Sequence, residues 1–248
     1  MGLNTLLKST VFTLKMYRLY WANMLSVMLV LPLTYLAVVT LFSGGSPESL
    51  LIGLTGFTVM VCFTTMVYPV ALQVANMFEE QVLEIYASLP VSLRELLVST
   101  VISQLVFSAP AIAVSLVALK ALATTVDTVY VVVSVVLSLL FFSALAVALG
   151  LVFKSRYKLD SLLTVLMMLL VVATPLYYKL GSVEGYLKIA LLVNPVTHMV
   201  CLLREGVGVS EGVSPWVSAA YLVVASITLV VLVFYKTRVG VLTVLERR

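Results

Sequence analysis

Residues 128–153 read TVYVVVSVVLSLLFFSALAVALGLVF, and none of these 26 residues is charged. A helix needs about 20 apolar residues to cross the ~30 Å hydrocarbon core of a bilayer. This stretch therefore predicts a membrane-spanning helix. Similar charge-free stretches occur on both sides of it and predict further spans.

The composition points the same way. Of the 248 residues, 62% are hydrophobic and 10% are charged, whereas soluble domains are about 45–50% apolar and about 25% charged. Because a water-soluble globule cannot bury that excess, the composition argues against soluble enzymes, nucleic-acid-binding modules and disordered chains. Cys62 and Cys201 both lie in apolar surroundings and indicate neither a disulfide framework nor a metal site.

We predict an all-α integral membrane protein with six transmembrane helices. The expected spans are residues 21–42, 49–78, 96–119, 128–153, 161–178 and 212–235. A further apolar stretch, 189–203, is too short to cross alone and predicts a partial element. Residues 21–248 then form one transmembrane domain. Residues 1–20 combine helical spacing of leucines with basic side chains, which is typical of an amphipathic helix lying in the membrane interface.

The basic residues predict the orientation, because they concentrate in cytoplasmic loops. An even number of spans places both termini on one side, and eleven of the 15 basic residues belong to that side: Lys8, Lys15, Arg18, Arg94, Lys154, Arg156, Lys158, Lys236, Arg238, Arg247 and Arg248. The other four are Lys120, Lys179, Lys188 and Arg204. We therefore expect a multi-pass protein of the plasma or inner membrane with both termini in the cytoplasm. The net charge of +4 then reflects topology and not a nucleic-acid partner.

Residues suited to chemistry are scarce. No predicted span carries an ionisable side chain in its body, which disfavours ion-driven transport, since such residues mark proton and ion pathways. His198 is the only histidine, so a two-histidine metal site within the chain is excluded, and we expect a partly exposed helical histidine. The chain also lacks the Gly-x4-Gly-Lys-Ser/Thr loop that binds nucleotide phosphates. We predict no catalytic residue, no metal and no cofactor in this chain.

The segment between the second and third spans, residues 79–95, reads EEQVLEIYASLPVSLRE. Ser92 and Glu95 have the spacing of a capping box, so a helix should begin there. Pro90 prevents the preceding helix from continuing. This leaves a short acidic helix at about 81–89 on the cytoplasmic surface. The four glutamates of the 79–95 segment, against one arginine, favour a protein partner over the alternative, a loop helix resting on lipid.

The outer segment at 175–204 is the second place that suggests a function. Pro175 is expected to end the fifth span. Asn194 followed by Pro195 predicts a helix start, because asparagine caps helices well and proline suits the first helical position. That helix should run to Arg204 and stop near Gly206. Two short helices dipping into the outer leaflet would form a lid, and a plain extracellular loop is the alternative.

Together these strings resemble the transmembrane subunit of type-2 ABC exporters. The resemblance rests on LE at 83–84 with LPVSLRE at 89–95, TPLYY at 174–178, and LLVNPVT at 191–197 with Arg204. It covers nearly the whole chain in order and spacing. One departure is Lys179, where the family often has a second proline after the aromatic pair.

The resemblance implies a half-transporter. Two such chains, identical or paralogous, would pair with two separate ATPase subunits, which would bind the ATP and Mg²⁺. The resemblance assigns a coupling role toward the ATPase to Glu80, Leu83, Glu84, Tyr86, Leu89, Pro90 and Arg94. It assigns an outer gate to Pro175, Tyr177, Asn194, Pro195 and Arg204. Uncharged apolar spans suit a hydrophobic or amphipathic substrate. The alternatives are an ATP-independent channel or carrier and a membrane scaffold; an intramembrane enzyme is nearly excluded.

Overall fold

The computed structural model describes residues 46–79, 92–153 and 155–245, together with isolated positions near the N-terminus and Val82. Beyond Tyr235 it describes the helical backbone and the side chain of Thr237. Apart from those isolated positions, the predicted interfacial helix at 1–20, the first span at 21–42 and the short helix at 81–89 lie outside the described residues. These three predictions, and the division into residues 1–20 and 21–248, therefore stay predictions.

The described part of the chain contains helices and no strand. The long helices are α4 (Pro47–Asn76), α6 (Leu93–Leu122), α7 (Thr128–Phe153), α8 (Arg156–Val172) and α11 (Pro215–Leu245). The short ones are the 3₁₀ turn η3 (Leu180–Ser182), α9 (Gly185–Val193) and α10 (Pro195–Gly206). Four helices within the described residues are long and apolar enough to cross a membrane, and a fifth span is possible if α9 and α10, which meet at 91°, are counted as one broken span. The prediction of an all-helical membrane protein is confirmed, and the count of six spans stays a prediction.

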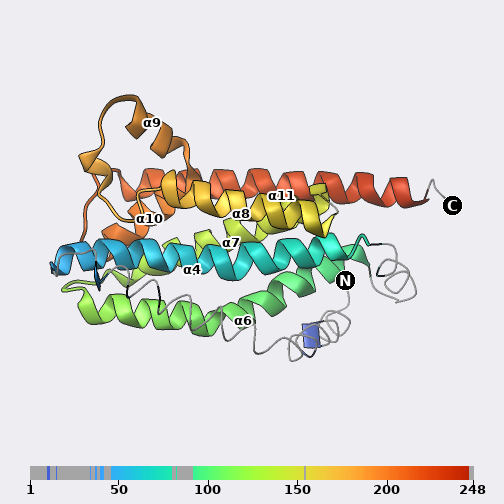
Figure 1. The fold of residues 1–248 in the computed structure, drawn as a ribbon, viewed down its shortest axis with the longest axis horizontal. Helices are drawn as coiled ribbons and strands as arrows, with labels where there is room; N and C mark the ends of the chain where they lie inside the picture. The colour runs from blue at the N-terminus through green and yellow to red at the C-terminus, as the bar shows by residue number, and fades with distance from the viewer. Residues whose placement is uncertain are drawn as a thin grey trace.

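The long helices lie side by side, and α9 and α10 gather at one end of the bundle (Figure 1). Helix α4 is central: it packs against α6, α7, α8 and α10, and its middle is almost entirely buried. Helix α7 forms a second layer and contacts α4, α10 and α11. At Gly150, a Cβ would lie 2.6 Å from the Cβ of Val74, so only glycine lets α7 approach α4 this closely.

A proline inside α4 explains one contact between helices. Pro69 lacks an N–H, so the carbonyl of Thr65, four residues earlier, loses its partner within the helix. The side chain of Gln104 on α6 donates from Nε2 to that carbonyl at 2.6 Å. A polar side chain buried in an apolar bundle therefore satisfies the backbone group that the proline leaves free.

Helix α8 differs from the predicted fifth span at 161–178. It begins five residues earlier, at Arg156, and ends at Val172, three residues before Pro175. The early start places charged residues in the first turns, where they can reach the membrane surface. The early end follows from Pro175, which disfavours helical backbone at Thr174. Residues 173–184 instead form an irregular connection with one 3₁₀ turn.

Candidate functional site

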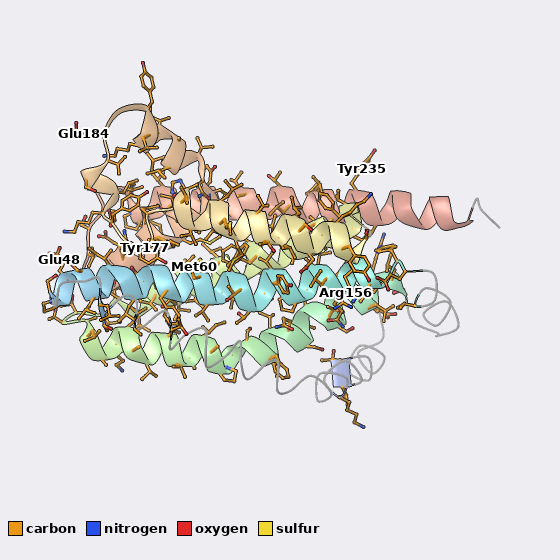
Figure 2. All side chains as sticks on the ribbon, viewed as in Figure 1. Glu48, Met60, Arg156, Tyr177, Glu184 and Tyr235 are labelled. Carbon is orange, nitrogen blue, oxygen red and sulfur yellow. The ribbon has the colours of Figure 1, made fainter. Side chains whose placement is uncertain are left out.

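The end of the bundle that holds α9 and α10 also holds the start of α4 and the end of α8. Glu48, Tyr177 and Glu184 lie at this end, whereas Arg156 and Tyr235 lie toward the other (Figure 2). Most residues of the predicted outer gate are in this region. At Asn194 the chain turns between α9 and α10.

Asn194 caps α10 and holds it against α8. Its backbone is extended, its Oδ1 accepts a hydrogen bond from the N–H of Val196 at 3.0 Å, and Pro195 is the first residue of the helix. Its Nδ2 donates to the carbonyl of Ala173 at 2.8 Å and to Oγ1 of Thr174 at 3.0 Å. One amide side chain therefore sets the bend and ties it to the end of α8. The predicted helix start at Asn194 and Pro195 is confirmed.

Arg204, near the end of α10, is 0% exposed and is surrounded by oxygen acceptors. Its guanidinium donates to Thr55 Oγ1 (3.1 Å), Glu211 Oε1 (2.6 Å) and the carbonyls of Ile52 (3.4 Å), Pro175 (2.7 Å), Leu176 (3.1 Å) and Tyr178 (2.9 Å). These acceptors come from three separate parts of the chain. Arg204 therefore joins α4, α10 and the 175–178 connection into one cluster.

Glu211 supplies the matching charge. One carboxylate oxygen pairs with Arg204, and the other accepts the N–H of Leu180 at 2.6 Å. Both side chains of the ion pair are almost completely buried. Removing one partner of such a pair costs about 3–5 kcal/mol, because the other charge is left uncompensated in a medium of low polarity. We call Arg204, Glu211, Thr55 and the 175–180 backbone the arginine cluster.

Gly56 lets the connection lie directly on α4. A Cβ at this position would be 2.3 Å from the carbonyl oxygen of Leu176 and 2.9 Å from its Cα. Both atoms belong to the backbone and cannot move aside as a flexible side chain could. A residue larger than glycine at position 56 would push the 175–178 connection away from the arginine cluster.

His198 ties α9 and α10 to α11. Its Nε2 lies 2.9 Å from the carbonyl of Leu192 and its Nδ1 lies 3.1 Å from Oγ of Ser218. Because a carbonyl only accepts, Nε2 carries the hydrogen and Nδ1 accepts from the serine hydroxyl. The ring also stacks on Tyr221, with centroids 4.4 Å apart. The expectation of a partly exposed histidine was wrong: His198 is buried, because α11 covers it.

The chain matches a known protein family over most of its length. The family described as "ABC-2 family transporter protein" matches residues 33–235, which include the whole outer site and five of the six predicted spans, with part of the first. The chain belongs to this family. No curated protein matches it.

As a member of the ABC-2 family, the chain is a membrane component of an ABC transporter. The family resemblance inferred from the sequence is confirmed. Of the five predicted gate residues, Pro175 and Arg204 meet in the arginine cluster. Asn194 and Pro195 lie at the other end of α10, where Asn194 contacts Ala173 and Thr174 next to Pro175. The backbone of Tyr177 belongs to the 175–180 connection, and its side chain is 45% exposed at the surface.

Most residues assigned to ATPase coupling lie outside the described residues of this ABC-2 protein: Glu80, Leu83, Glu84, Tyr86, Leu89 and Pro90. Arg94 is described, in the first turn of α6. Just before it, Ser92 accepts from the N–H of Glu95 at 3.3 Å, and Glu95 accepts from the N–H of Ser92 at 3.0 Å. The predicted capping box is therefore confirmed, and the coupling role stays a prediction.

Thr55, Gly56 and Glu211 were not predicted as site residues from the sequence. A weak signal existed for Glu211, a carboxylate seven residues after Arg204. Thr55 and Gly56 gave none, because they are about 150 positions away from Arg204. Among the described residues, no group of three or more His, Cys, Asp or Glu side chains could hold a metal ion.

Proposed function

We propose that the chain is the permease subunit of an ATP-driven exporter and that a separate ATPase subunit powers it. One observation carries the proposal: the chain belongs to the ABC-2 transporter family, yet its sequence has no phosphate-binding loop of its own. ATP and Mg²⁺ would then be bound by a partner. A second permease chain, identical or paralogous, would complete the transporter.

The position of α4 supports a coupling mechanism. Helix α4 begins at the outer site, where Ile52 and Thr55 contact Arg204, and its other end leads into residues 80–91. An ATPase that grips Glu80, Leu83, Glu84, Tyr86, Leu89, Pro90 and Arg94 would move the inner ends of α4 and α6. Because α4 packs against four other helices, such a movement would reach the outer site as a displacement of whole helices.

At the outer end, the arginine cluster and Asn194 would act as the gate. In the structure, the arginine cluster and Asn194 join α4, α8 and α10. We therefore infer that the structure represents a transporter whose outer end is closed. Opening would separate Pro175 and the Asn194–Pro195 bend from their partners. ATP would supply the energy, because the ATPase would bind the two permease conformations with different affinity.

The substrate would be hydrophobic or amphipathic. The helix faces that a substrate could contact are apolar. The charges of Arg204 and Glu211 are already paired with each other. The transporter would move the substrate out of the cell, away from the cytoplasmic side on which both termini are predicted to lie. The apolar outward faces of α6 and α11 would contact lipid or the second permease chain.

Purification in mild detergent with the native neighbours tests this proposal. We expect a P-loop protein in equal amount by mass spectrometry, and ATP hydrolysis that responds to the permease. Leu89→Asp and Glu84→Arg should abolish that response while leaving membrane insertion intact. Tyr186→Ala, which changes an exposed aromatic at the opposite end, is the matched control. Consistent absence of an ATPase would favour a passive channel, carrier or scaffold instead.

A further inference from the structure

Polar contacts hold α8 at its two ends. Near the start of the helix, the Tyr68 hydroxyl of α4 donates to the carboxylate of Asp160. Just beyond the other end, the Asn194 amide donates to the Ala173 carbonyl. Between these contacts lies a cleft of about 210 Å³, bounded by α8, α7, α4 and the bend between α9 and α10.

The lining of this cleft is almost entirely hydrocarbon. Phe63 and Phe142 line it from α4 and α7 and contact each other edge to face, with centroids 5.4 Å apart. Leu166 and Leu170 line it from α8. Asn194 is the polar side chain in the lining, and its amide is already engaged by α8 and by its own helix. An occupant would therefore find apolar contacts and no available polar partner, which favours a hydrocarbon.

The size and shape of the cleft suit a chain. An apolar cavity of about 150 Å³ in another protein holds benzene, a molecule of six carbons. By the same ratio, a cleft of about 210 Å³ holds about eight carbons. Its α8 wall runs from Leu166 to Ala173, which is about 10 Å along a helix axis. Leu169 in that wall is 59% exposed, so the cleft opens at the surface of the bundle.

We propose that this cleft binds the hydrocarbon chain of the amphiphile that the transporter moves. The proposal rests on the proposed function and adds a binding site for the substrate's hydrocarbon chain within one permease chain. The cleft reaches Asn194 and Pro195, so a bound chain touches the bend whose amide ties α8 to α10. Substrate binding and the outer gate therefore share two residues, Asn194 and Pro195.

Photolabelling tests the site. The full-length protein, with whatever partners purify with it, is placed in nanodiscs with palmitic acid that carries a diazirine midway along its chain. We expect saturable labelling on peptides of α7 and α8 that line the cleft, and competition by unlabelled palmitic acid. Leu166→Trp fills the cleft and should lower labelling at least about tenfold, the loss expected when two methylene groups are excluded from apolar contact.

Met168→Trp is the matched control, because it changes an exposed residue of α8 that does not line the cleft and should leave labelling unchanged. Leu145→Trp fills the cleft from α7 and serves if Leu166→Trp does not fold. Labelling that does not saturate, or that ignores both filling variants, would identify ordinary surrounding lipid and overturn the proposal. The assay needs neither ATP nor a partner, so its failure is distinct from the absence of an ATPase on purification.

Discussion

Arg204 is fully buried, and many of its hydrogen-bond acceptors belong to the backbone. Four of its acceptors are main-chain carbonyls, three of them in the 175–178 connection. That connection is irregular, because Pro175 interrupts helical structure. The arginine therefore stabilises an irregular segment in addition to forming an ion pair with Glu211.

This dual role predicts the result of a mutant series. Arg204→Ala should destabilise the protein by about 3–5 kcal/mol, since it strands the buried Glu211 carboxylate. The double variant Arg204→Met with Glu211→Leu should not recover this loss, because the carbonyls of the connection stay unsatisfied at about 1–3 kcal/mol each. A fluorogenic thiol dye can measure melting directly, because Cys62 and Cys201 are both buried until the chain unfolds.

Lys179→Gln is the control for this series. It breaks the ion pair of Lys179 with Glu48, both of which are exposed, and exposed pairs contribute about 0.2–1 kcal/mol. Its melting temperature should stay close to that of the wild type. Full recovery in the double variant would show that Arg204 matters only as one half of a charge pair.

At the scale of elements, Pro69 and Gln104 form a unit across two helices. Replacing Gln104 by leucine should leave the carbonyl of Thr65 without its side-chain donor and lower stability by about 1–2 kcal/mol. In a chain of this size that corresponds to a fall of roughly 2–8 °C in melting temperature. Thiol-dye melting of Gln104→Leu measures it.

The same change in a Pro69→Ala background tests the cause. An alanine N–H can restore the bond to the Thr65 carbonyl within α4, so Gln104→Leu should then cost much less. An equal cost in both backgrounds would mean that Gln104 acts through packing alone. Gln104→Glu is a poor substitute, because it would bury a charge.

Elements were predictable from the sequence where local signals determine them. The starts of α6 and α10 follow from a capping residue and a neighbour within three positions, Ser92 with Glu95 and Asn194 with Pro195. The extent of α8 was predicted in part: Pro175 was expected to end the span and the helix ends three residues before it, whereas the charge-free stretch 161–178 missed the start at Arg156. Most partners of Arg204 lie between 26 and 152 positions away, and no local pattern could identify them. His198 was misjudged for the same reason, since α11 buries it.

At the scale of the whole molecule, the bundle separates its charges along its length. Helix α4 has 30 residues, which is about 45 Å and exceeds the ~30 Å hydrocarbon core of a bilayer. The arginine cluster and α9 lie at one end, and Arg156, with the start of α6, lies toward the other (Figures 1 and 2). This arrangement agrees with the two sets of basic residues from which the orientation was predicted.

Two cysteine variants test that orientation. Tyr186 in α9 is 93% exposed and Tyr157 in α8 is 85% exposed, and they belong to opposite sides in the predicted topology. With both native thiols buried, the wild type should react little with a membrane-impermeant maleimide. Tyr186→Cys should react in intact cells, and Tyr157→Cys should react only after permeabilisation, because eleven of 15 basic residues hold its side in the cytoplasm. The reverse pattern would invert the topology and place the arginine cluster on the cytoplasmic side, so it could not then be the outer gate.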